Sequence, residues 1–267
     1  MASNGETQDI LISTAGNVST ITLNRPKRGN AITKLMATEI VSSLESMEAD
    51  PSLRVIILTG AGKYFCTGMD LGGGSDIQSL SPGVDAVVGM FERVRTCSKP
   101  VIALVNGPAL GGGVGLVFAC DFRFALKHVF FEFSEVKRGI VPAIISTFIV
   151  PQMGPFASQQ LMLSGARLSS AEAKGYGLLT EVCDGEESIA AHAKECVASL
   201  MSSAPQAMST IKKLVRHVAD NNHENGVAYA KGVFKEMMVS EEARYGITSF
   251  QKKEKPDWTS FAAKSKL

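Results

Sequence analysis

A run of glycines near the middle of the chain has the composition of an anion-stabilising turn. Residues 111–113 are all glycine, and they follow an apolar, β-branched segment at 101–105 and an Asn-Gly-Pro break at 106–108. Without side chains, their backbone N–H groups are open to a ligand. The apolar segment 114–119 predicts a helix whose N-terminus adds partial positive charge there. The pattern favours an oxyanion hole, and from the glycines alone a tight turn with close helix packing is an equal alternative.

A second break has a related composition. Residues 64–71 read Tyr-Phe-Cys-Thr-Gly-Met-Asp-Leu, and Gly-Gly-Gly-Ser follows at 72–75. The spacing of the glycines at 111–113 does not fit the common phosphate-binding motifs, because G-x-G-x-x-G would require glycine where Leu116 stands and no Gly-Lys-Ser/Thr follows these glycines. Dinucleotide and P-loop binding are therefore not supported.

Composition excludes several further classes of protein. The chain has 267 residues, 45% of them hydrophobic, and a net charge of +1, which gives no general attraction to nucleic acid or acidic membrane surfaces. Its five cysteines form no C-x-x-C pair and its four histidines no H-E-x-x-H, so we expect neither a disulfide framework nor a metal site. No apolar segment approaches the length of a membrane span, and no G-x-S-x-G elbow is present.

The elements that must position the two breaks follow an α/β order. Alternating segments at 9–14 and 18–24 around Gly-Asn predict a hairpin, and apolar spacing predicts a helix at 33–50 with Thr33 as its N-cap. Strand and helix patterns then recur, with strands expected at 54–59, 101–105, 122–125, 129–133 and 178–183 and helices at 84–97 and 143–153. Residues 169–172 have the pattern of a capping box.

Beyond residue 185 the pattern is helical. We expect helices at 186–202, 205–219 and 224–250. The predicted organisation is a core of β-β-α units at 1–200 that carries the site, followed by a helical region at 201–267.

Six segments together resemble the crotonase family of enoyl-CoA hydratases and isomerases, and the match runs from about Asp9 to Val182. The segments are NRPKRGNAI (24–32), VIILTGAGKYFCTGMDL (55–71), KPVIALVNGPALGGGVGL (99–116), CDFRFA (120–125), FSEVKRGIVPA (133–143) and LSSAEAKGYGLLTEV (168–182). The resemblance implies a spiral of β-β-α units with a C-terminal trimerisation region, and trimers or hexamers. It also implies an acyl-CoA thioester as substrate, with no cofactor besides the coenzyme A that this substrate carries.

The resemblance also assigns roles to particular residues. It implies that the backbone N–H groups of Met69 and Gly112 hold the thioester oxygen, with Gly111 beside them and Asp70 fixing the first turn. Positive charges that could meet the phosphates of coenzyme A are Lys27, Arg28, Lys252 and Lys253.

Glu135 occupies the position of one of the family's acid/base glutamates, whereas Gly115 stands where typical hydratases carry a second one. One carboxylate suffices to move a proton from C2 to C4, which favours isomerisation of 3-enoyl-CoA to 2-enoyl-CoA in fatty-acid breakdown. Two alternatives stay open. One is hydration of 2-enoyl-CoA, including branched or methylglutaconyl-type substrates, with Glu135 serving both steps. The other is a protein that binds acyl-CoA without catalysis.

The last three residues, Ser265-Lys266-Leu267, match the address that the peroxisomal import receptor reads. We therefore expect a peroxisome or a related organelle as the location.

Overall fold

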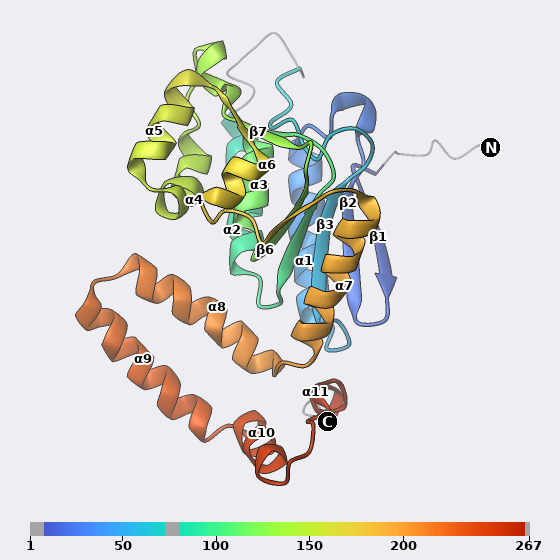
Figure 1. Ribbon diagram of the computed structural model, residues 1–267, viewed down its shortest axis with the longest axis vertical. Coiled ribbons are helices and arrows are strands. Elements are labelled where there is room, and N and C mark those ends of the chain that lie inside the picture. The colour runs from blue at the N-terminus through green and yellow to red at the C-terminus, as the bar shows by residue number, and fades with distance from the viewer. Residues whose placement is uncertain (1–7, 73–80, 265–267) are drawn as a thin grey trace, which may run out of the picture.

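The computed structural model describes residues 8–72 and 81–264, which form an α/β structure built on two sheets (Figure 1). The larger sheet has six strands in the order β1-β2-β3-β4-β6-β9. Its strands are β1 (Ile10–Ala15), β2 (Val18–Leu23), β3 (Val55–Gly60), β4 (Val101–Val105), β6 (Phe122–Leu126) and β9 (Glu181–Cys183). Only β1 and β2 are antiparallel, and each later strand adds in parallel to the one before.

The predicted hairpin is confirmed, with Ala15 paired to Val18 across a turn in which Gly16 has a φ of +58°. Strands β3 and β4 are almost entirely buried, as expected of parallel strands covered on both faces. Helix α1 (Lys34–Ala49) begins after Thr33, whose hydroxyl accepts a hydrogen bond from Met36 N at 2.9 Å. This confirms the predicted cap.

Helices follow one another across the sheet and enclose the core. Helix α1 packs on α2 (Ser81–Thr96), α2 on α3 (Gly112–Ala119), and α3 on α4 (Ala143–Met153). Helix α3 begins two residues before the predicted start, because its first turn includes glycines 112 and 113. The capping box also forms, with Ser169 and Glu172 exchanging hydrogen bonds at the start of α6 (Ser170–Gly175).

A small second sheet lies beside the glycine turn. It orders β5 (Ala109–Leu110), β7 (Phe130–Glu132) and β8 (Arg167–Ser169). Strands β5 and β8, and helix α5 (Pro155–Ser164), were not predicted. Two or three residues are too few to show the alternation of a strand, so these pairings arise from the tertiary fold.

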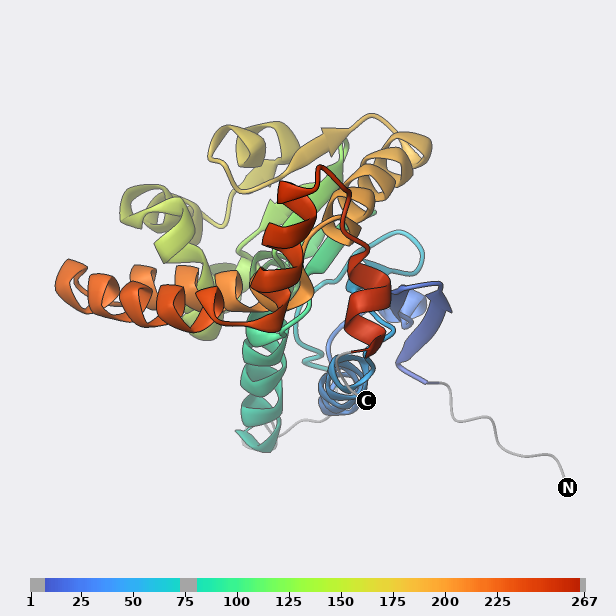
Figure 2. The ribbon, with the colours of Figure 1, turned by 90° about the horizontal axis from the view of Figure 1, so that it is seen from below.

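The C-terminal helices are α7 (Glu186–Met201), α8 (Pro205–Asp220), α9 (His223–Met238), α10 (Glu241–Gln251) and α11 (Trp258–Lys264). Helix α7 packs on β6 and β9, whereas α8 and α9 lie side by side and extend away from the main body (Figures 1 and 2). The prediction of one helix at 224–250 was wrong. The chain breaks at Val239, and the Ser240 hydroxyl caps α10 by accepting from Ala243 N at 3.1 Å.

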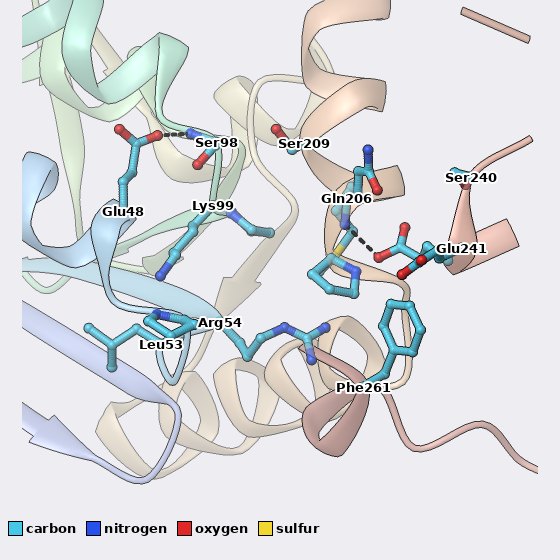
Figure 3. A pocket seen from close by; sticks show the side chains of 15 residues that line it. Glu48, Leu53, Arg54, Ser98, Lys99, Gln206, Ser209, Ser240, Glu241 and Phe261 are labelled. Carbon is cyan, nitrogen blue, oxygen red and sulfur yellow. Dashed lines mark hydrogen bonds between the residues drawn. The ribbon is translucent and has the colours of Figure 1, made fainter. Parts of the chain in front are cut away.

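Buried charges join these helices to the sheet. Arg54, 3% exposed, donates from Nη2 to Ser203 O at 2.7 Å, and Glu242, also 3% exposed, accepts from the N–H groups of Gln206 and Ala207 at 2.8 Å each. A cavity of about 590 Å³ separates the two side chains; Figure 3 shows Arg54, Gln206 and Phe261 around it.

The predicted boundary at residue 200, between the core of β-β-α units and the helical region, stays a prediction.

Among the described residues, none of the helices has the length and apolarity needed to cross a membrane. Within the same residues there is no cluster of side chains suited to a metal ion. The tripeptide at 265–267 lies outside the described residues, so the import address stays a prediction; residues 73–80 also lie outside them.

Candidate active site

The two glycine-rich breaks meet in the fold, and their backbone N–H groups lie next to one another. A Cβ atom on Gly112 would lie 3.6 Å from Met69 N, and one on Gly68 would lie 3.2 Å from Gly112 N. Neither Met69 N nor Gly112 N donates a hydrogen bond to another residue in the described part of the chain. The structure therefore brings together the pair of donors that the resemblance implies for an oxyanion hole.

Hydrogen bonds on either side of this pair fix its position. Gly68 O accepts from Ile32 N at 2.8 Å and Asp70 N donates to Ile32 O at 2.9 Å, so both neighbours of Met69 are engaged. On the other break, Leu110 N donates to Cys66 O and Gly111 N donates to Glu132 O, each at 2.9 Å. The backbone on both sides of each donor is therefore hydrogen-bonded, and these bonds hold the N–H groups of Met69 and Gly112 in position.

Glu135 lies directly over the glycine turn. Its carboxylate oxygen Oε1 is 3.0 Å from the position that a Cβ atom would take on Gly111, whose φ of +50° also favours glycine. A side chain at 111 would push the carboxylate away from the two N–H groups. Glycine at this position therefore allows the close approach of acid and oxyanion donors.

The carboxylate of Glu135 is partly buried and incompletely hydrogen-bonded. Its Oε2 atom is inaccessible to solvent and has no hydrogen-bond partner among the described residues. Burial raises the pKa of Glu135 above its ordinary value, and the hydrogen bond from its own backbone N–H and the charge of Arg138 oppose this shift only in part. A carboxyl group with a raised pKa can exchange a proton closer to neutral pH than an exposed glutamate can.

A cavity of about 480 Å³ contains these groups. Of the described residues that line it, Glu135 is the single acid and Arg138 the single base. The remaining wall is largely apolar and includes Leu71, Val87, Phe91, Leu110, Ile140, Val141, Ile144 and Ile145. This combination suits an apolar acyl chain that ends in a polar reacting group.

Gly115 stands where typical hydratases carry the second glutamate, and a side chain from the neighbouring helix α4 fills the space beside it. A Cβ atom on Gly115 would overlap Cγ2 of Ile145 and would lie 3.4 Å from Cε1 of Phe91. Both of these side chains are buried, and both line the cavity. The described residues thus place no second carboxylate on this wall.

Asp70 lies next to the donors but is not among the residues that line the cavity. Its carboxylate binds Arg25 Nη2 at 2.8 Å and Arg28 Nη2 at 3.4 Å, and accepts from Gly72 N at 3.0 Å. Although burial acts in the opposite direction, these partners hold the pKa of Asp70 below its ordinary value. The predicted role in fixing the turn matches these contacts.

Sequence reasoning missed two residues that support the first break. Arg25 also pairs with Asp9, and Asn30 is buried, with a φ of 54° and side-chain hydrogen bonds to the backbone of Ala61 and Tyr64. The available signal was the Arg-Gly-Asn sequence at 28–30, since asparagine tolerates positive φ and caps turns.

The four cations proposed to bind the phosphates of coenzyme A do not all lie near one another in the structure. Lys27 and Arg28 are exposed on the short helix η1 (Pro26–Arg28), and Arg28 is close to the first break through Asp70. Lys252 and Lys253 follow α10, at the opposite end of the molecule from α3 and β7 in Figure 1. Within one copy of the chain, these two lysines lie away from Glu135.

Comparisons with known proteins identify the family of this chain. The family model described as enoyl-CoA hydratase/isomerase matches residues 13–261. The enoyl-CoA hydratase ACTT6 of Alternaria alternata is 37% identical over 238 residues, which cover 89% of this chain and 79% of that protein. The peroxisomal Delta(3,5)-Delta(2,4)-dienoyl-CoA isomerase of Arabidopsis thaliana is 28% identical over 258 residues, covering 91% of this chain and 93% of its own.

Solved structures give the same result. The crystal structure of an enoyl-CoA hydratase from Bacillus anthracis superposes with a TM-score of 0.89 at 29% identity, and covers 94% of this chain and 99% of that one. The α/β fold of this chain is therefore shared with these proteins. The chain belongs to the crotonase family of enoyl-CoA hydratases and isomerases.

Proposed function

We propose that this enzyme moves the double bond of a 3-enoyl-CoA thioester to give the 2-enoyl isomer. The observation that carries the proposal is that one carboxylate, Glu135, lines the same cavity as the pair of N–H donors while Ile145 fills the space beside Gly115. Isomerisation needs a single group that takes a proton at C2 and returns it at C4. Hydration is served better by two carboxylates, one for water and one for the proton.

The proposed steps follow from the positions of these groups. The thioester oxygen accepts hydrogen bonds from Met69 N and Gly112 N, and Glu135 removes a proton from C2. The electrons of the broken C–H bond form a dienolate, whose negative charge rests on the oxygen held by the two N–H groups. Glu135 then returns the proton to C4, which leaves the double bond between C2 and C3. The reaction needs no cofactor besides the coenzyme A of the substrate.

Hydration of 2-enoyl-CoA is the second candidate. It is favoured by the names of the relatives, since ACTT6 and the Bacillus anthracis protein are both called enoyl-CoA hydratase. In that reaction Glu135 would have to activate the water and also supply the proton. A protein that binds acyl-CoA without catalysis is a third candidate. It gives no reason for Glu135, whose Oε2 atom has no partner among the described residues, to line the same cavity as the Met69 and Gly112 N–H groups, which donate to no described residue.

Product analysis separates the three. The protein is incubated with 2-enoyl-CoA and with 3-enoyl-CoA of several chain lengths, and the products are identified by mass and by the position of the double bond. We expect equal mass with a shifted double bond. A gain of one water from 2-enoyl-CoA as the faster reaction would replace the proposal with hydration, and no change with any substrate would favour the binding protein.

We also propose that copies of the chain associate as trimers or hexamers through the C-terminal helices. Support comes from large apolar side chains that are exposed on α8, α9 and α10: Ile211, Val215, Val218, Val227, Phe234, Met238, Ile247 and Phe250. Exposed apolar area of this kind is typical of an interface. Because Lys252 and Lys253 lie away from the cavity of their own copy, the proposed contact of these lysines with the phosphates of coenzyme A requires the cavity of another copy. Light scattering at several protein concentrations tests the oligomeric state.

A further inference from the structure

Glu132 is a buried carboxylate close to the active site that the proposed reaction does not use. It is 7% exposed and lies at the end of β7. Lys137 Nζ donates to its Oε1 atom and Arg167 Nε to its Oε2 atom, each at 3.1 Å. Although burial opposes the shift, these two cations lower the pKa of Glu132. The side chain is therefore ionised and held from two sides.

The backbone of the same residue contacts the oxyanion turn. Glu132 O accepts the hydrogen bond from Gly111 N at 2.9 Å, and Glu132 pairs with Leu110 in the register of β5 and β7. Gly111 precedes Gly112, whose N–H is one of the two free donors. The position of that donor thus depends on where β7 holds Glu132.

The side chain of the same residue restrains the turn that carries the acid. Lys137 lies two residues after Glu135 in the short helix η3 (Ser134–Arg138), so its ion pair ties η3 back to β7. Arg167 lies on β8 opposite Glu132 in the antiparallel β7–β8 pair, and its guanidinium lies over the Phe130 ring, 4.2 Å from the ring centroid. The Lys137 and Arg167 side chains are 53% and 67% exposed, whereas the Glu132 carboxylate that both of them bind is 10% exposed. Two ion pairs that share one buried carboxylate restrain its geometry more than a single exposed pair does.

We propose that Glu132 is a positioning residue that sets the distance between Glu135 and the oxyanion donors. Its carbonyl holds the Gly111–Gly112 turn and its carboxylate holds η3, so one residue connects the two halves of the site. The proposal rests on the proposed function, in which Glu135 and the Gly112 N–H act on the same substrate. Misplacement of reacting groups by about 1 Å can lower a rate by about 100-fold, which makes such a connection important.

The test is a substitution that removes the charge of the Glu132 side chain and keeps its shape. The variant Glu132→Gln leaves Lys137 and Arg167 without a charged partner, so we expect kcat to fall by about 10- to 100-fold with KM changed by less than about threefold. Lys137→Met should have a similar effect, and the double variant should be little worse than either single variant, because both break the same connection. Glu181→Gln is the matched control, since Glu181 binds Lys174 at 3.2 Å on another strand, and it should leave kcat unchanged.

A second readout does not require turnover. Binding of butanoyl-CoA, which has no double bond to move, should lower the infrared carbonyl stretch of the thioester because Met69 N and Gly112 N polarise it. We expect the shift in the carbonyl stretch, counted per molecule of bound butanoyl-CoA, to be smaller for Glu132→Gln than for the wild type or Glu181→Gln. Partial unfolding would reduce the amount of bound butanoyl-CoA but not the shift of each bound molecule.

An unchanged carbonyl shift together with kcat within twofold of the wild type would overturn the positioning role. Additive losses in the double variant would also overturn it. If the wild type neither isomerises nor hydrates any enoyl-CoA, the proposed function fails, while the carbonyl shift still tests whether Glu132 places the donors.

Discussion

Ile145 on helix α4 fills the space beside Gly115 on helix α3. A Cβ atom on Gly115 would overlap Cγ2 of Ile145 and lie 3.0 Å from its Cβ. Phe91 closes the same space from α2, and its ring lies 5.7 Å from that of Phe148 on α4. Three helices thus meet at a residue without a side chain, and the wall they form is apolar where typical hydratases carry a carboxylate.

Replacing Glu135 by glutamine should abolish turnover. The variant keeps the shape of the side chain but can no longer take a proton, and general acid/base groups contribute about 10²- to 10⁴-fold to rates. Steady-state kinetics measure the loss of kcat, and calorimetry with butanoyl-CoA measures binding, which should change by less than about threefold. Turnover above about a tenth of the wild-type rate would mean that another group transfers the proton.

The pH dependence of the reaction should reflect the environment of Glu135. Glu135 must be ionised to act as the base, and burial raises its pKa. As the pH is lowered, kcat/KM should therefore begin to fall at a higher pH than it would with an exposed glutamate, whose pKa is about 4.3.

A raised pKa also means that ionised Glu135 destabilises the fold. Its contribution to stability is most favourable below the pKa of the unfolded chain and is lost as the pH rises through the folded pKa.

The stability consequence can be measured separately. Glu135→Gln should gain stability over the wild type as the pH rises from about 4 to about 8. Urea unfolding at several pH values gives the two free energies of unfolding. A difference that does not vary with pH would show that burial does not penalise the ionised carboxylate.

Gly115→Ala should destabilise the fold by about 1–3 kcal/mol, because the added methyl group overlaps Ile145. In an Ile145→Ala background the same change should cost less than about 1 kcal/mol, since the overlap is removed. Gly89→Ala is the matched control. Gly89 also lies in a helix, but an added Cβ would meet no described atom within 4 Å outside its chain neighbours and its own helix backbone, so this change should stabilise by about 0.5–1 kcal/mol. Equal costs in the two backgrounds would contradict the packing described for Ile145.

The buried charges between the sheet and the C-terminal helices should matter more than surface pairs. Glu242→Gln removes the carboxylate that accepts from Gln206 N and Ala207 N and faces Arg54, and should cost about 2–4 kcal/mol in the free energy of unfolding. Asp184→Asn, which breaks an exposed pair with Lys127, should cost less than about 0.5 kcal/mol. Similar values for both variants in urea unfolding would contradict this role of Glu242.

The local sequence pattern was sufficient to predict most helices and strands and the two glycine-rich breaks. The hairpin at β1 and β2, the Thr33 cap and the Ser169 capping box follow from interactions within a few residues of sequence, so they could be predicted without tertiary information. Strand β4 and helix α4 coincide with the predicted ranges for the same reason. Strands β5 and β8 could not be predicted, since their two or three residues are ordered by their neighbours.

The sequence by itself determined which residues could carry the chemistry. The glycines at 111–113 indicated a turn able to hold negative charge, because their backbone N–H groups are open to a ligand. The roles of Met69 and Glu135 followed from the resemblance of their motifs to the crotonase family, since a single glutamate in a polar segment does not by itself indicate proton transfer.

Only the tertiary structure decided how these residues meet. Met69 N and Gly112 N become neighbours through contacts between segments about forty residues apart, and the Ile145 side chain fills the Gly115 space from a separate helix. The connection through Glu132 likewise depends on pairing with Lys137 and Arg167. Such contacts arise from packing between distant segments, which the local periodicity of a sequence does not encode.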